Sequence, residues 1–355
     1  MVPGESSAIE LVRYQKLPKL LLHEHLDCSL RPETMLELWS KIGFAHAPAN
    51  LASSVVTLWT AGQRQLAAAA YQQFLQAEAS QSLSRYVQAI VHHVLPLMQS
   101  AESLRRITFE RVLDAAADGI VAMQLRFAPQ LHTGAGLSLS GVMDAVIAGL
   151  EASPMPVLLM ICSLRHEDEA MAKRLVDLAI AYKAHVRLFD LAGDEHANPG
   201  VPLWWARQAA RAREHGIETD IHLWETDEPQ DQDIDRLAEY GIERVGHGVQ
   251  GDKQGSLLLE VCPTSNLVTG AVASIAEHPV DRLFKAGKRV TINTDGTLFT
   301  AATLSDEYRL LTETFAWGAP EFHHVNLTAL HAMPLPEQTK AEIAALLRLA
   351  YFESC

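Results

Sequence analysis

Short apolar runs rich in β-branched residues recur along the chain, and most precede polar residues and then a longer segment of helical periodicity. Eight runs are candidate strands: 19–25, 122–127, 157–162, 186–191, 218–222, 244–247, 257–262 and 289–293. Connections such as 168–184 and 202–216 each have the length of one amphipathic helix. Eight repeats of strand and helix predict an α/β fold, a parallel (β/α)8 barrel of TIM type.

The first connection is much longer than the others. It is rich in Ala, Leu, Gln and Glu and predicts a helical excursion over about 30–118, with Ser100 or Ser103 as one N-cap and Gly119 after its last helix. Residues 337–353 predict a closing helix. Because no internal repeat or low-complexity linker marks a boundary, residues 1–355 are expected to form a single domain.

The connection between the sixth and seventh strands is unusually short, since only 249–256 separate them. A crossover helix does not fit there, although about eight extended residues reach roughly 27 Å and can return to the other end of a strand. We expect the barrel wall to be thin at this point. The C-terminal helix or a second subunit is expected to cover it, so a homo-oligomer is open.

Composition narrows the class of protein. The 355 residues are 48% hydrophobic and 20% charged, which fits a globular chain with a sizeable core. A formal net charge of −14 repels phosphate backbones, so nucleic acid is not expected as a partner. Cys28, Cys162, Cys262 and Cys355 form no Cys-x-x-Cys pair, and no segment resembles a signal core or a membrane helix. We expect a cytoplasmic protein that acts on a small molecule.

Four candidate metal ligands follow predicted strands. His23 and His25 stand two apart at the end of the first strand, where residues i and i+2 share a face. His222 ends the fifth strand, and Asp295 follows the eighth. Each alone is commonly a structural residue, but all four fall at carboxyl ends of strands, where parallel barrels carry their active sites. Three imidazoles and one carboxylate suit one catalytic zinc ion per chain, although these ligands do not separate zinc from another divalent ion.

Two further residues fit proton transfer. Glu225 stands three positions after His222, and a carboxyl group beside a metal can shuttle protons. His247 lies between two glycines at the end of the sixth strand, where a slim backbone lets its ring face the cavity.

The chain resembles the adenosine deaminase family in seven ordered motifs between about Leu17 and Tyr308. They are HEHLDCS (23–29), LRFAPQ (125–130), DLAGDE (190–195), HLWE (222–225), GHG (246–248), EVCPTSN (260–266) and TLSDEY (303–308). The resemblance implies zinc held by His23, His25, His222 and Asp295. It implies zinc-hydroxide attack on the amine-bearing carbon of a purine-like ring, with release of ammonia.

The resemblance also assigns roles to other residues. Glu225 would protonate a ring nitrogen, and His247 would orient and deprotonate the water and stabilise the developing charge. Asp27 would meet a ribose hydroxyl, and the backbone of Gly193 would meet a ring nitrogen.

Residues near the expected substrate depart from the family pattern. Gly296 stands where the family has a second aspartate that bonds the purine ring, which removes a charge-assisted hydrogen bond of roughly 1.5–3 kcal/mol. Trp224 adds bulk beside Glu225, and Cys28 replaces a glycine. We therefore expect a zinc-dependent deaminase of an adenosine-like nucleoside or related amine-bearing heterocycle, with a substrate altered from adenosine and chosen in part by Trp224 and Gly296.

Two alternatives stay open. A relaxed zinc site would hydrolyse another C–N bond, and an inactive family member would bind zinc and a nucleoside without turnover. The first predicts ammonia or amine release from other compounds, and the second predicts tight binding without product.

Overall fold

The computed structural model describes residues 14–226, 237, 239–250 and 255–353. All strand pairs are parallel, in two ladders with the orders β1-β2-β3-β4-β5 and β6-β7-β8-β9. The strands are β1 Lys19–Leu21, β2 Ile120–Phe127, β3 Val157–Leu164, β4 Val186–Ala192, β5 Glu218–Thr219, β6 His222–Leu223, β7 Arg244–His247, β8 Leu258–Val261 and β9 Arg289–Ile292.

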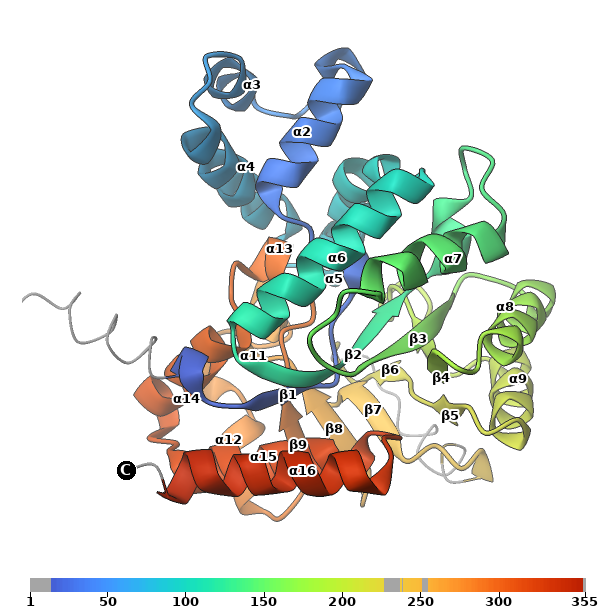
Figure 1. Ribbon diagram of the computed structural model, residues 1–355, viewed down its shortest axis with the longest axis vertical. Helices are drawn as coiled ribbons and strands as arrows, with labels where there is room; N and C mark the ends of the chain where they lie inside the picture. Colours follow the sequence, from blue (N-terminus) through green and yellow to red (C-terminus); the bar gives the residue numbers. More distant parts are fainter. Residues whose placement is uncertain (1–13, 227–236, 238, 251–254, 354–355) are drawn as a thin grey trace, which may run out of the picture.

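Two features join the ladders into a closed barrel. The fifth predicted strand is divided into β5 and β6: the amide of Asp220 still bonds the carbonyl of Phe189 in β4, whereas the amide of Gly246 in β7 bonds the carbonyl of Ile221. At the other seam, Glu24 pairs with Asp295 in a parallel bridge beyond β1 and β9. The predicted (β/α)8 barrel is therefore confirmed (Figure 1).

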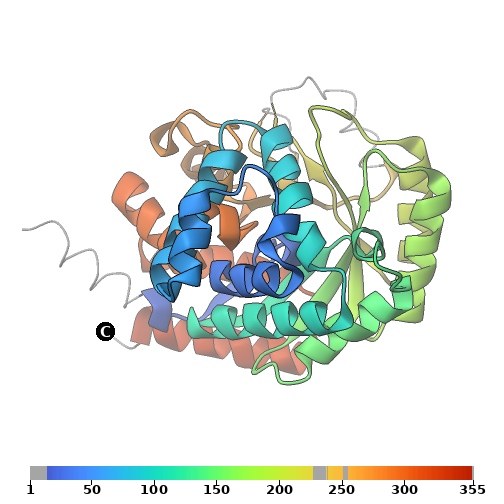
Figure 2. The ribbon, with the colours of Figure 1, turned by 90° about the horizontal axis from the view of Figure 1, so that it is seen from above.

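The long first connection is helical, as expected. Its elements are α2 Pro32–Ile42, α3 Ser53–Thr60, α4 Arg64–Ala79, α5 Leu83–Ala89, a π-helical turn Ile90–Val94 and α6 Ala101–Ala117. Ser100 caps α6 through a capping box with Ser103, and Gly119 has φ +81° where the chain turns into β2. Figure 2 shows these helices lying over one end of the barrel.

Helices also surround the barrel. They are α7 Leu139–Leu150, α8 Glu169–Ala181, α9 Leu203–Glu214, α11 Pro263–Val268, α12 Val280–Lys285, α13 Thr297–Thr300, α14 Leu304–Phe315, α15 Ala319–Ala332 and α16 Glu337–Arg348. The predicted closing helix is α16 with the π-helical turn Leu349–Glu353. Among the described helices, none combines the length and apolar character that a membrane crossing requires.

The short connection after β7 lies partly outside the described residues, which stop at Gln250 and resume at Gly255. On the nearby flank, α15 packs against β1 and β9, and the carbonyl oxygen of Ala332 lies 3.4 Å from Nη1 of Arg244 in β7. That the C-terminal helix or a second subunit covers the sixth and seventh predicted strands, β7 and β8 in the structure, stays a prediction.

Candidate active site

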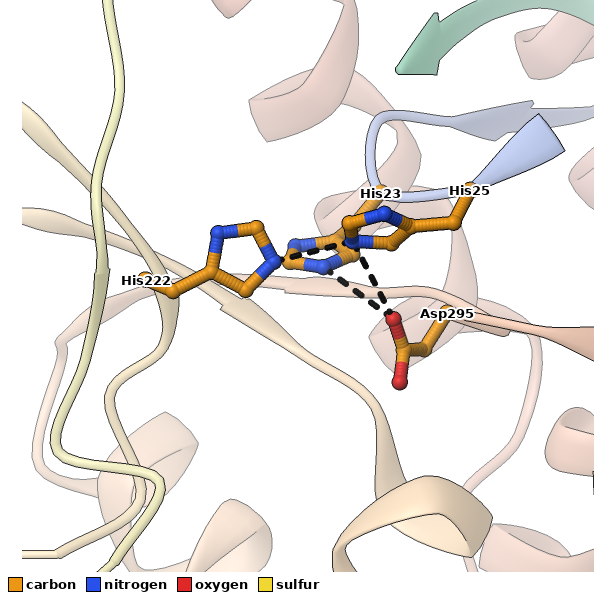
Figure 3. A group of neighbouring side chains, drawn as sticks. All are labelled: His23, His25, His222 and Asp295. Carbon is orange, nitrogen blue, oxygen red and sulfur yellow. Dashed lines mark hydrogen bonds and ion pairs between the residues drawn. The ribbon is translucent and has the colours of Figure 1, made fainter. Parts of the chain in front are cut away.

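Three histidines and one aspartate from three parts of the chain meet at the carboxyl end of the barrel strands. One ligand atom from each of His23, His25, His222 and Asp295 lies within 4.8 Å of all the others. Nε2 of His25 is 2.9 Å from Nε2 of His222, and Oδ1 of Asp295 is 3.4 and 3.5 Å from Nε2 of His23 and His25. Figure 3 shows the four side chains pointing toward one another.

The four donors fit a metal ion. Nε2 of His23 is completely buried, and its contact with Oδ1 of Asp295 is long, at 3.4 Å, and falls short of normal hydrogen-bond geometry. Burial lowers the pKa of His222 to about 4, so its imidazole is neutral at pH 7 and has a lone pair to offer. Although burial opposes ionisation of Asp295, hydrogen bonding to His23 and the other histidines holds its pKa well below the usual range. The site thus presents three imidazoles, of which that of His222 is neutral, and one carboxylate, a set that suits zinc.

Acidic side chains orient the histidines from behind. Nδ1 of His23 lies 3.2 Å from Oε2 of Glu260, and Nδ1 of His222 lies 3.0 Å from Oδ2 of Asp190. A neutral imidazole that donates from Nδ1 presents the lone pair of Nε2, which therefore faces the centre of the cluster in both residues. Ser265 donates to Oδ2 of Asp295 at 2.6 Å and leaves Oδ1 directed at the histidines.

A buried arginine connects these acidic side chains. Nη2 of Arg126 lies 2.6 Å from Glu260 and 3.2 Å from Asp220, and Nη1 lies 3.4 Å from Asp190. Arg126 is fully buried inside the barrel. Its positive charge compensates the negative charge of the carboxylates that orient His23 and His222, and Arg126 thereby stabilises the arrangement of the candidate ligands.

Glu225 is held at the edge of the cluster by a second carboxylate. Glu195 accepts hydrogen bonds from the backbone amides of Trp224, Glu225 and Thr226 at 2.8, 3.0 and 3.2 Å, which fixes the turn after β6. Burial, followed by the charges of Asp295 and Glu195, raises the pKa of Glu225 to about 8. A carboxyl group with this pKa is protonated at neutral pH and can act as a general acid.

His247 faces Glu225, with 3.4 Å between Nε2 and Oε2. Burial, and then the neighbouring His23, hold its pKa well below the usual range, so the ring is neutral. A Cβ atom at Gly246 would lie 2.6 Å from Cε1 of His23, so only glycine fits at that position. The flanking glycines predicted from the sequence therefore include one that close packing against a candidate ligand requires.

Three residues of the candidate site have strained backbone conformations. Trp224, His247 and Asp295 have φ values of +57°, +63° and +61°, in the left-handed region that non-glycine residues seldom adopt. Such conformations persist where the surrounding structure imposes them, and they are concentrated at functional sites.

A cavity of about 170 Å³ opens onto the cluster. Asp27 and Gly193 line it, as the resemblance implied, together with His25, His222, Glu225, His247 and Asp295. The other two expected substrate contacts do not: Trp224 is packed in the hydrophobic core, and Gly296 lies behind Cys28 and Tyr86.

Several site residues were not singled out from the sequence. Asp190 and Glu260 lie in the DLAGDE and EVCPTSN motifs, at the ends of β4 and β8, but only the closed barrel places them behind His222 and His23. Tyr86, Thr269 and His278 carry no local signal, because each reaches the site through tertiary packing.

Comparison with known proteins agrees with this geometry. The family model described as adenosine deaminase matches residues 18–349. An adenosine deaminase of Mycobacterium ulcerans is 34% identical over 360 residues, covering 93% of this chain and 93% of the relative. The chain belongs to the adenosine deaminase family. Membership makes it a hydrolase of the purine deaminase class.

Two solved structures share the fold of this family member. An N6-mAMP deaminase from Arabidopsis has a TM-score of 0.80 at 24% identity and covers 94% of this chain and 98% of its own. An amidohydrolase from Burkholderia, solved with bound Zn, has a TM-score of 0.81 at 20% identity and covers 99% and 94%.

Proposed function

We propose that the chain is a zinc-dependent aminohydrolase that releases ammonia from an adenosine-like purine nucleoside or a related amine-bearing heterocycle. The observation that carries this proposal is the convergence of four metal-binding side chains with Glu225 and His247 at one cavity. His23, His25, His222 and Asp295 would hold the ion. Bound zinc supplies a nucleophile near neutral pH, because it lowers the pKa of a coordinated water to about 7.

The chain's own residues provide the remaining chemistry. Protonated Glu225 gives its proton to a ring nitrogen, which makes the adjacent amine-bearing carbon more electrophilic. Neutral His247 donates from Nε2 toward the attacking oxygen and stabilises the charge that develops there. The proton of the added hydroxyl group passes to the amine, so that ammonia leaves when the carbon–nitrogen bond breaks, and the ring keeps an oxo group and the proton given by Glu225.

Asp27 and Gly193 fit substrate positioning. Asp27 lines the cavity beside His25, where its carboxylate can accept a hydrogen bond from a sugar hydroxyl. Gly193 has φ +106°, a conformation that L side chains seldom adopt, and its backbone faces the same cavity. We assign its amide to a ring nitrogen. We also propose that the preferred compound differs from adenosine.

The test is release of ammonia from adenine, adenosine, aminopyrimidines and the corresponding monophosphates, and release of methylamine from N6-methyladenosine, with metal content measured in the same preparation. Zinc near one equivalent per chain with ammonia from at least one aminopurine supports the proposal. Nucleoside binding without ammonia favours the inactive alternative, and hydrolysis of only non-aromatic C–N bonds favours the relaxed hydrolase. A cytoplasmic location and a homo-oligomer stay predictions.

A further inference from the structure

Gly296 occupies a position where no side chain fits. Its backbone is extended, with φ −148° and ψ 101°, so its conformation does not demand glycine. A Cβ atom built there would lie 2.5 Å from Cβ of Cys28, 2.5 Å from the hydroxyl oxygen of Tyr86 and 2.9 Å from the carbonyl oxygen of Cys28. Space taken by Cys28 and Tyr86, rather than backbone geometry, therefore explains the glycine beside Asp295.

Tyr86 brings its hydroxyl to this place from α5. Its ring packs against Phe299 of α13 with centroids 4.8 Å apart, and the side chain lines the cavity while the residue is only 4% exposed. In the part of the chain that the structure describes, the hydroxyl has no hydrogen-bond partner of normal geometry. Its polar neighbour is the thiol of Cys28, which is a weak donor and acceptor. Buried tyrosine hydroxyls usually have a partner, so a ligand in the cavity is the group that would supply one.

The charge of the cavity limits what that ligand can be. Its described lining includes the carboxyl groups of Asp27, Asp194, Glu225 and Asp295 but no lysine or arginine. The guanidinium of Arg165, which reaches the carbonyl of His222, is already bonded to backbone carbonyls. Apart from the proposed metal ion, a phosphate group would lose its hydration here without gaining a cationic side chain of the lysine or arginine type.

Part of the cavity wall is apolar. Leu83 and Val87 of α5, Ile90 and Val91 of the following turn, and Leu95 line it. Such a wall accommodates an uncharged ring and its substituents through contact rather than hydrogen bonding.

We propose that the Tyr86 hydroxyl, which occupies the space beside Gly296, is a specificity-determining group that hydrogen-bonds the ring of an uncharged, phosphate-free aminopurine. The inference rests on the proposed function and names its substrate class. A phenol offers both a donor and an acceptor without charge, so it recognises a ring nitrogen or N–H without requiring a cationic ligand. A carboxylate at the same place would only accept.

Tyr86→Phe removes the hydroxyl and keeps the ring. With the unphosphorylated aminopurine that releases ammonia fastest, kcat/KM is expected to fall about 5- to 100-fold, since the ring nitrogen loses its partner. The 3-deaza and 7-deaza analogues identify the contact: with one of them, the wild-type protein and the variant should perform alike. Tyr182→Phe removes a hydroxyl bonded to Asp144 outside the cavity and serves as the matched control.

The phosphate part of the proposal is tested by comparing adenosine with adenosine 5′-monophosphate. The wild-type protein is expected to favour adenosine by at least about 100-fold in kcat/KM. Equal or better use of the monophosphate overturns this part of the proposal, and ammonia release that Tyr86→Phe leaves unchanged overturns the role of Tyr86; in both cases the proposed function stands.

Binding of adenosine by calorimetry gives a readout without turnover. Weaker binding by Tyr86→Phe supports the inference even if no ammonia forms, which would contradict the proposed function alone. Equal binding by the two proteins overturns the inference. If no aminopurine is bound or deaminated, the inference and the proposed function both fail.

Discussion

The side-chain amide of Asn266 lies 3.1 Å from Nδ1 of His247, and its orientation is fixed by a third residue. The backbone amide of Val280 donates to Nδ1 of His278 at 3.1 Å, so the proton of neutral His278 is on Nε2, which lies 3.3 Å from Oδ1 of Asn266. The amide nitrogen of Asn266 must therefore donate to His247. Neutral His247 carries its own proton on Nε2, toward Glu225.

This tautomer makes His247 a hydrogen-bond donor to the reacting centre. Of the roles implied by the family resemblance, it favours orienting the water and stabilising the developing charge over removing a proton. His278 and Asn266 are thus positioning residues, which act through His247.

Asn266→Asp tests the arrangement, because a carboxylate accepts where the amide donates. His247 would then take a proton on Nδ1 and its pKa would rise. We expect kcat to fall about 10- to 100-fold, with a smaller change in KM and a shifted pH profile of kcat. Asn50→Asp, an exposed site bonded to Glu78, is the matched control. A pH profile identical to that of the wild-type protein contradicts the assigned tautomer.

Glu225→Gln removes the proposed acid without changing its size. Turnover is expected to fall by about two to four orders of magnitude, because an amide cannot protonate the ring, while zinc content stays the same. Ammonia release and metal analysis on the same sample separate the two effects, and Glu214→Gln on α9 is a control outside the cavity. Retained activity would remove Glu225 from the mechanism.

The pH dependence follows from the acid form of Glu225. Its pKa is raised from the usual value to about 8 by burial and by neighbouring negative charge, so the protonated form exists below that pH and is lost above it. We expect kcat/KM to decline as pH rises through about 8, and a bound dication would move this decline to lower pH. The check is kcat/KM measured between pH 6 and 10 at fixed metal content. Activity that increases steadily across that range is incompatible with an acid role.

Asp190→Asn weakens the orientation of His222. Its carboxylate is bonded to Nδ1 of His222, and replacing such a partner typically costs about 10- to 100-fold in metal affinity. Competition with a fluorescent zinc chelator measures this affinity directly. Asp144→Asn on α7 is the control, and unchanged zinc affinity in Asp190→Asn would show that the carboxylate is not needed to hold the imidazole.

The predictable part of the molecule is local. The strands follow from short apolar runs and the four candidate ligands from motifs at the ends of three of them, so the barrel and the expected positions of His23, His25, His222 and Asp295 could be stated in advance. Contacts across the barrel could not be predicted from the sequence. Arg126 contacts Glu260, 134 positions further along the chain, and His278 contacts Asn266 from a separate loop. The division of the fifth strand also depends on its change of neighbour between β4 and β7, which has no local sequence signal.

Gly296 shows the limit of reading a substitution from sequence alone. From the motif, the position lacks a carboxylate, so Gly296→Asp tests whether restoring one creates or raises adenosine turnover. In the structure a Cβ atom there collides with Cys28 and Tyr86, so the single variant is expected to lower both thermal stability and kcat/KM. Combining it with Cys28→Gly and Tyr86→Phe removes the two side-chain contacts, although the carbonyl oxygen of residue 28 stays at 2.9 Å, and should recover part of the melting temperature lost by the single variant. Melting curves and adenosine kinetics of the single and triple variants test this expectation. A single variant as stable as the wild-type protein would mean that Cys28 and Tyr86 move to make room for the new side chain, and that the hydroxyl of Tyr86 is not held in place.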